Sequence, residues 1–236
     1  MVALITSTIA PGRKELLGGE PRSFFSPGER YEQTVRTVLS LKAHGIGEIF
    51  LVDNSDDGVP VEYADGLAGM GVKVLPVQQY QFGNKSVNEV LLVLYALRYL
   101  PDGVPVLKIS GRYFLNGRFL PPDRFPEDFI VKPHRFGKRG GIVSTRCYLA
   151  RDKRILEITL KQVLAEMYVY NARVVGPRSL VNFLKQIFNP SSIAETSISI
   201  EGALCLVLQY NRNRVRFLDT LGVGGAGSSA GDSYEE

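Results

Sequence analysis

Four short apolar runs that alternate with helical patterns constrain the fold more than any other feature of this chain. They are nearly continuous in Val, Ile and Leu, and they cover Val2–Ile9, Glu48–Val52, Val72–Val77 and Val104–Ile109. Strands that are buried on both faces of a sheet have this composition. Because strands that alternate with helices build parallel sheets, the sequence predicts an α/β fold with a Rossmann-type, mostly parallel sheet flanked by helices.

The two helices expected between these strands have recognisable ends. Ser26-Pro27 introduces the first, whose apolar residues recur at helical spacing as far as Gly45. The second covers Asn84–Leu100 and is apolar on nearly every face. Either Asn84 or Ser86 can serve as its N-cap, and capping is the favoured interpretation of Ser86.

The second half of the chain has a different texture. Its predicted elements are strands at Phe129–His134, Ile142–Leu149 and Ser197–Ile200 and helices at Asp152–Met167, Arg178–Phe188 and Glu201–Tyr210. We therefore divide one domain into residues 1–115 and an acceptor-side half, 116–220. Residues 221–236 are rich in Gly and Ser, which predicts a disordered tail.

Composition excludes several kinds of protein and of site. The formal net charge of the 236 residues is only +4, and Lys and Arg are scattered, which argues against a nucleic-acid partner. Two histidines cannot build a zinc site of the usual spacing. Cys147 and Cys205 lie in apolar runs, which predicts buried free thiols in a reducing compartment.

The sequence gives no sign of export or of a membrane span. Val2–Ile9 begins a strand pattern without the basic region of a signal peptide. The longest apolar run, Val90–Leu97, is too short to cross a bilayer. We expect a cytoplasmic protein, whose modest positive charge leaves peripheral membrane association open.

Polar residues lie at or just after the carboxyl end of each predicted strand, at the edge where open α/β sheets bind ligands. They are Thr6-Ser7-Thr8, Asp53-Asn54-Ser55-Asp56, Gln78-Gln79-Tyr80 and the segment Lys108–Tyr113. An Asp after a strand, followed by Asn-Ser-Asp, also forms Asx turns without any ligand. For Asp53 taken alone, turn formation and ligand contact both stay open.

Two segments resemble family-2-type glycosyltransferases with the GT-A fold. Phe50–Asp57 (Phe-Leu-Val-Asp-Asn-Ser-Asp-Asp) is similar to their V-D-D-x-S-x-D segment, and Phe82–Glu89 to their G-K-x-x-A-x-N helix start. The order of elements agrees over about half of the chain. The resemblance implies a nucleotide-sugar donor, with Thr8 and Asp53 contacting the base or ribose. The other substrate-binding residues that we assign are Thr6, Asn54, Lys85, Asn88, Lys108, Ser110 and Arg146.

The chain departs from that family at the end of its fourth strand. Family members place an Asp-x-Asp there, which holds Mn²⁺ or Mg²⁺ against the diphosphate, whereas this chain has Lys108, Ser110 and Arg112. Lys and Ser cannot ligate a hard cation in that way, but a guanidinium can stabilise a departing diphosphate. We expect catalysis by Arg112, helped by Lys108, without a metal cofactor. The alternatives are that Lys108 and Arg112 pair with nearby carboxylates, and that Asp56 and Asp57 serve Mn²⁺ or Mg²⁺.

An inverting transferase also needs a carboxylate that takes the acceptor proton. Glu201 follows a short predicted strand and opens an apolar helix, which makes it the first candidate. A Glu in the first turn of a helix also suits the helix dipole without any catalysis. Glu195 and Asp128 are the next candidates.

The sequence therefore predicts a glycosyltransferase that moves a sugar from a nucleotide-sugar donor to a glycan or lipid-linked acceptor, as in polysaccharide biosynthesis. A sugar nucleotidyltransferase is one alternative, although Thr8–Arg13 only weakly matches the basic, glycine-rich loop of those enzymes. The other is a silent nucleotide-sugar-binding module. The sugar, nucleotide, acceptor, stereochemistry and oligomeric state are left open.

Overall fold

The computed structural model describes most of the chain, and the account below is confined to that part. The described residues are 1–11, 25–76, 79–80, 82, 84–121, 126–137, 140–172, 176–177, 180–181, 184, 198–210, 214–226 and 233–235. Glu195 and most of the predicted helix Arg178–Phe188 lie outside them.

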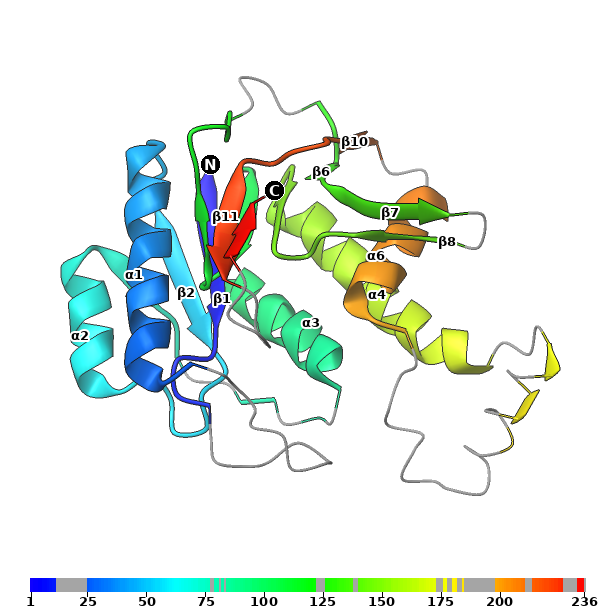
Figure 1. Ribbon diagram of the computed structural model, residues 1–236, viewed down its shortest axis with the longest axis horizontal. Coiled ribbons are helices and arrows are strands. Elements are labelled where there is room, and N and C mark those ends of the chain that lie inside the picture. The colour runs from blue at the N-terminus through cyan, green and yellow to red at the C-terminus, as the bar shows by residue number, and fades with distance from the viewer. Residues whose placement is uncertain are drawn as a thin grey trace.

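A seven-stranded sheet forms the centre of the molecule (Figure 1). Its order is β10 (Val215–Phe217), β6 (Phe129–Val131), β9 (Cys147–Ala150), β4 (Val106–Ser110), β1 (Val2–Ser7), β2 (Ile49–Asp53) and β3 (Val72–Val74). Strand β9 is antiparallel to both of its neighbours, β4 and β6, and the other pairs are parallel. The prediction of a mostly parallel α/β sheet is confirmed.

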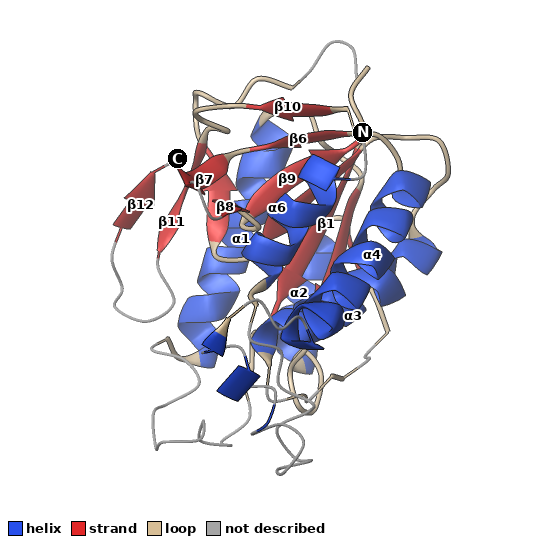
Figure 2. Cartoon of the chain, turned by 90° about the vertical axis from the view of Figure 1, so that its right-hand side faces the viewer, coloured by secondary structure: helices blue, strands red, loops and turns tan. Residues whose placement is uncertain are grey.

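Helices cover both faces of this sheet (Figures 1 and 2). On one face lie α1 (Pro27–Ala43) and α2 (Val61–Gly69), and on the other lie α3 (Lys85–Ala96), α4 (Lys153–Ala172) and α6 (Ile200–Tyr210). Successive strand residues alternate between two cores, so Leu4 packs with α3 while Ile5 packs with α1. A short 3-10 helix, Leu97–Tyr99, follows α3.

Helices α1 and α3 are both capped at their N-termini by side chains. Ser26 and Glu29 form a capping box at the start of α1, as the predicted helix start requires. At α3, the side chain of Asn84 accepts hydrogen bonds from Ser86 N at 2.8 Å and Val87 N at 3.4 Å. Of the two predicted N-cap candidates, Asn84 is therefore the cap, and Ser86 is not.

Two smaller sheets complete the described structure. Strands β7 (Pro133–Gly137) and β8 (Gly140–Val143) form a hairpin, so the second half of the chain contains more strands than its sequence predicts. Strands β5 (Tyr113–Leu115), β11 (Val223–Ala226) and β12 (Ser233–Glu235) form an antiparallel sheet. The predicted strand Ser197–Ile200 is replaced at its described end by the start of α6, where the Ser199 hydroxyl accepts from Gly202 N.

The predicted disordered tail is wrong for residues 221–226, because glycine lets this segment approach β5 closely. Val223 is fully buried and pairs with Leu115. A Cβ on Gly225 would lie 2.5 Å from the Arg112 carbonyl oxygen, and Gly222 has a φ of +68°. The glycines that look like low complexity in the sequence therefore serve close backbone contact beside Arg112.

The structure also describes the environment of both cysteines and the apolar character of the helices. Cys147 and Cys205 are free and buried, as predicted, and burial raises the pKa of the Cys205 thiol. Among the described residues, no helix has both the length and the apolar character that a transmembrane segment needs.

Candidate active site

A cavity of about 230 Å³ opens at the carboxyl edge of β1 and β4. Parallel strands bring the ends of distant segments together at this edge, which is where α/β folds bind ligands. Its described walls come from the end of β1, the first turns of α1 and α3, and the turn after β4. They consist of Thr6, Ser7, Thr8, Ile9, Pro11, Arg30, Thr34, Asn54, Lys85, Asn88, Glu89, Leu92, Ser110, Gly111 and Arg112.

Two guanidinium groups face this cavity. Arg30 Nη1 donates a hydrogen bond of 2.8 Å to Thr8 O, which fixes the side chain across the end of β1. Burial, and then the positive charge of Arg112, lower the pKa of Arg30 to about 10, while Asp53 opposes this shift. Arg112 Nη1 is buried and has no hydrogen-bond partner among the described residues. Such a pair of cations is an electrostatic match for a phosphate or diphosphate group.

Gly111 allows the chain to place Arg112 next to α1. A Cβ at this position would lie 3.0 Å from Thr34 Oγ1 and 3.1 Å from the Ser7 Cβ. The Thr34 hydroxyl, a single donor, lies within hydrogen-bond distance of both Arg30 O, at 2.9 Å, and Gly111 O, at 3.3 Å. The turn after β4 is thus tied to the first turns of α1, which carry Arg30.

Lys108 lies behind the cavity wall rather than in it. Its side chain has no exposed surface, and its ammonium group forms an ion pair with Glu89 and donates to Thr145 O at 2.7 Å. Strand alternation points it toward α3, and the Tyr148 ring lies 5.6 Å away. The alternative of a carboxylate partner therefore holds for Lys108, which can act on a cavity ligand only through Glu89.

Asp53 ties the ends of β1 and β2 together. Its carboxylate accepts hydrogen bonds from Ser7 Oγ, from Ile9 N at 2.9 Å and from Ser55 N at 2.8 Å. The bond to Ser55 N closes an Asx turn, as one of the two interpretations of this segment requires. Asp53 is buried and is not part of the described cavity wall.

Asn54 and Asn88 clamp the backbone that enters α3. Asn54 donates to Tyr80 O at 3.0 Å and accepts from Tyr80 N at 2.8 Å. Asn88 makes the same pair of bonds with Phe82, each of 2.9 Å. Both residues line the cavity, but these bonds use their amide groups to shape its wall.

The remaining predicted residues divide between the cavity and its surroundings. Thr6, Thr8, Lys85 and Ser110 lie in the wall. Arg146, beside it, donates from Nε to Tyr113 OH at 3.1 Å. Glu201 accepts a hydrogen bond of 3.3 Å from Thr145 Oγ1, so it also lies outside the described wall and is linked to it through Thr145 and Lys108.

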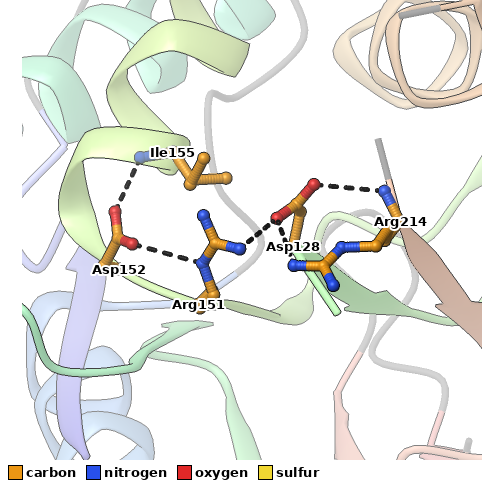
Figure 3. A network of polar contacts seen from close by, with 5 residues as sticks. All are labelled: Asp128, Arg151, Asp152, Ile155 and Arg214. Carbon is orange, nitrogen blue, oxygen red and sulfur yellow. Dashed lines mark hydrogen bonds and ion pairs between the residues drawn. The ribbon is translucent and has the colours of Figure 1, made fainter. Parts of the chain in front are cut away.

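Asp128 belongs to the opposite edge of the sheet. It precedes β6, and its carboxylate pairs with Arg151 at 2.8 Å and accepts from Arg214 N at 3.1 Å (Figure 3). Arg151 also contacts Asp152, which accepts from Ile155 N at the start of α4. Because β6 runs parallel to β4, this network lies at the amino edge, and Asp128 is not a candidate for catalysis in the cavity.

Sequence reasoning missed Arg30 and Glu89. Glu89 ends the segment Phe82–Glu89 that carries the family resemblance, so its position offered a signal. Arg30 follows the capping residue Ser26 by one turn of α1, where a basic side chain looks merely solvated. Only the contact between α1 and the turn after β4 brings Arg30 to Arg112.

The described residues do not fit a divalent metal in this cavity. Glu89 is the one carboxylate among those that line it, and Lys108 already neutralises its charge. No described group of three or more His, Cys, Asp or Glu residues could hold a metal ion. A hard cation needs several oxygen ligands with unneutralised charge.

The fold of this chain is similar to that of several solved structures. The nucleoside-diphosphate-sugar pyrophosphorylase of Vibrio cholerae RC9 superposes with a TM-score of 0.50 at 12% identity, covering 94% of each chain. The fold is GT-A-like. The glycosyltransferase GlyE of Streptococcus pneumoniae TIGR4 gives 0.49 at 13% identity, over 92% of this chain and 46% of its own.

A third structure, the inositol-1-phosphate CTP transferase of T. maritima, has a TM-score of 0.47 at 13% identity, with 92% of this chain and 85% of that chain covered. No family model matches the sequence. No curated protein matches it either. At these identities the GT-A-like likeness describes the fold, and the reaction has to be argued from the site.

Proposed function

We propose that this protein is a glycosyltransferase that moves a sugar from a nucleotide-sugar donor to a hydroxyl group of a glycan or lipid-linked acceptor. One observation carries the proposal: Arg30 and Arg112 face a single cavity at the carboxyl edge of a GT-A-like sheet. The pKa of Arg30, about 10, keeps it charged at neutral pH. A diphosphate would place negative charge between the two guanidinium groups and relieve their mutual repulsion.

In the proposed reaction the acceptor oxygen forms a bond with the anomeric carbon of the donor. The bond from that carbon to the diphosphate oxygen breaks, and its electron pair leaves with the nucleoside diphosphate. Arg112, with Arg30, stabilises the charge that develops on the leaving oxygen. The cations thereby perform the electrostatic work that carboxylate-bound metal ions perform in transferases with an Asp-x-Asp.

Glu201 is our proposed acceptor of the proton that the attacking hydroxyl group loses. It lies outside the described cavity wall, and it accepts a hydrogen bond from the Oγ1 of Thr145, whose carbonyl oxygen holds Lys108. Glu89 is less suited, because protonation of its carboxylate would leave the buried Lys108 ammonium without its counter-ion. Replacement of Glu201 by Gln should abolish turnover and spare donor binding, and retained turnover would exclude Glu201 from this role.

Thermal shift with UDP-, GDP-, CMP- and dTDP-sugars, followed by an assay of nucleotide release in EDTA, tests the proposal. We expect one class of donor to raise the melting temperature and to release its nucleotide when an acceptor is present. A protein that no donor stabilises, or whose turnover appears only when Mn²⁺ or Mg²⁺ is restored, would contradict metal-independent glycosyl transfer.

Nucleotidyl transfer is the second candidate, favoured by the position of the cavity wall. Thr8, Ile9 and Pro11 of the wall belong to the segment that follows β1, and Arg30 is bonded to Thr8 O. In that reaction a sugar phosphate oxygen attacks the α-phosphorus of a nucleoside triphosphate, and pyrophosphate leaves toward the cations. Stabilisation by a nucleoside triphosphate and release of pyrophosphate with a hexose 1-phosphate would identify it.

A further inference from the structure

The cavity has two chemically different parts. Arg30, Lys85 and Arg112 supply positive charge, whereas Glu89 alone supplies a carboxylate among the described residues of the wall. Glu89 lies in the first turns of α3 and its side chain is 30% exposed, so a cavity ligand can reach it. A carboxylate repels phosphate and accepts hydrogen bonds from neutral hydroxyl groups. The two parts therefore suit different portions of one ligand.

Lys108 fixes the carboxylate of Glu89 from behind. The ammonium group is fully buried, and Thr145 O holds it in place at 2.7 Å. Tyr148, opposite Lys108 on β9, is also buried, and burial, followed by the charge of Glu89, raises the pKa of its phenol far above the usual value. Lys108 on β4 and the loop carbonyl of Thr145 thus hold Glu89 of α3 from the side of the buried sheet.

We propose that Glu89 recognises the sugar: its carboxylate accepts hydrogen bonds from hydroxyl groups of a hexosyl group whose phosphate lies against Arg30 and Arg112. Lys108 is the positioning residue that aims this carboxylate. The inference rests on the proposed function of the same site and names its specificity-determining residue. A site built to hydrogen-bond a hydroxyl group discriminates against a ligand that lacks that group.

The ion pair explains why Glu89 serves recognition rather than proton transfer. Both partners are charged, and the Lys108 side chain has no access to water that could compensate for loss of its counter-ion. A charged carboxylate makes shorter and stronger hydrogen bonds with hydroxyl donors than a neutral acceptor does. Glu89 can therefore accept hydrogen bonds from sugar hydroxyl groups while it remains the counter-ion of Lys108.

Calorimetric titration of the full chain tests this assignment. The ligands are inorganic phosphate, the 1-phosphates of glucose, galactose and mannose, and UDP with UDP-glucose and GDP with GDP-mannose. The measured quantity is selectivity, the affinity for a sugar-bearing ligand divided by that for its sugar-free counterpart. We expect Glu89→Gln to lower the selectivity of the preferred sugar about tenfold, the loss of one charge-assisted hydrogen bond. Its affinity for inorganic phosphate should stay unchanged or rise, because a negative charge is removed.

Three further variants separate recognition from folding. Arg112→Gln should weaken sugar-bearing and sugar-free ligands by the same factor. Glu48→Gln changes a matched Glu–Lys pair on the surface, where Glu48 contacts Lys73 at 2.9 Å, and should change nothing. Lys108→Met combined with Glu89→Gln removes the buried charge together with its partner, so it carries the same prediction if the single variant is unstable.

The outcomes are distinct. Wild-type selectivity that survives in Glu89→Gln overturns the role of Glu89 and leaves the proposed function standing. A wild type that binds phosphate but prefers no sugar-bearing ligand overturns both. Selectivity that depends on Glu89, in a protein that releases no nucleotide from any donor, supports Glu89 and contradicts glycosyl transfer.

Discussion

Both edges of the central sheet hold acidic and basic side chains, but the ratio of acidic to basic residues differs between them. At the amino edge, Asp128 contacts the guanidinium groups of Arg151 and Arg214 (Figure 3). Asp152 contacts Arg151 and accepts a hydrogen bond from Ile155 N. At the carboxyl edge, the described cavity wall holds three basic residues and one acidic residue, and Arg112 Nη1 has no described partner. Charge that is balanced within the protein fastens strands and helices to one another. At the carboxyl edge, the described basic residues of the wall outnumber the acidic one, which suits an anionic ligand.

The comparison also separates two uses of an acid–base pair. Arg151 is partly exposed, so water shares the stabilisation of its charge. Lys108 is fully buried, and its charge depends on Glu89 and on Thr145 O. A buried pair costs desolvation that it recovers only in good geometry, and loss of one partner is severe. Because of this asymmetry, substitutions in the Lys108–Glu89 pair should best reveal the difference between the charge pairs of the two edges.

The largest expected effect is the loss of the buried counter-ion. Glu89→Leu leaves the Lys108 ammonium group with Thr145 O alone, and we expect the free energy of unfolding to fall by about 3 kcal/mol. Addition of Lys108→Met should recover most of that loss, because both charges are then absent. Urea unfolding of the two variants measures this, with Glu48→Leu as the exposed control. Equal losses in Glu89→Leu and Glu48→Leu would show that the buried pair has no special cost.

Replacement of one cavity cation comes next. Arg112→Gln should weaken the binding of inorganic pyrophosphate about 100-fold, because it removes a charge-assisted, bidentate donor. Arg216→Gln is the matched control, since Arg216 pairs with Glu127 beside the amino edge. Calorimetric titration of both variants compares the edges directly. Similar losses in both would mean that pyrophosphate binding follows the net charge of the protein and not the cavity.

Removal of an amino-edge carboxylate should affect stability and leave ligand binding unchanged. Asp128→Ala breaks the ion pair with Arg151 and the hydrogen bond from Arg214 N. We expect a loss of about 2 kcal/mol in the free energy of unfolding. Pyrophosphate affinity, measured in the same preparation, should stay at the wild-type value. A drop in affinity would show that the two edges are coupled.

The smallest expected effect is a gain in stability. Arg112 lowers the pKa of Arg30 through like-charge repulsion, which follows burial as the second cause of the shift. Arg112→Gln removes that repulsion, so the melting temperature of the unliganded protein should rise by up to about 2 °C. Differential scanning calorimetry without phosphate in the buffer measures it. A lower melting temperature would instead assign Arg112 a stabilising role in the folded protein.

Local signals in the sequence were reliable where burial enforced them. The four apolar runs became β1–β4, and β1, β2 and β4 are buried along nearly their whole length because helices cover both faces of the sheet there. Lys108 is the fully buried charged residue within them, whereas Lys73 in the edge strand β3 is exposed. The polarity of Lys108 correctly indicated an unusual strand. Its partner could not be read from β4, because Glu89 comes from α3 on the face of the sheet toward which Lys108 points.

Signals failed where the partner of a segment lies far along the chain. The glycines of residues 221–226 read as low complexity, but they let β11 pair with β5 and approach Arg112. Asn54 and Asn88 line the cavity, and their amides also clamp the backbone of Tyr80 and Phe82, so contact with a donor stays a prediction for both. An Asn side chain presents the same donors and acceptor to a backbone as to a ligand, so residue type cannot distinguish the two uses.

The sequence by itself determined the α/β sheet, the starts of α1 and α3, and the absence of paired carboxylates at the end of β4. These follow from periodicity and capping, which act over a few residues. Only the tertiary structure decided that Lys108 is buried behind the cavity wall, that Glu89 lines the cavity, and that Arg30 and Arg112 line the same cavity. Those relations depend on which face of each strand meets which helix, and packing across the whole sheet sets that choice.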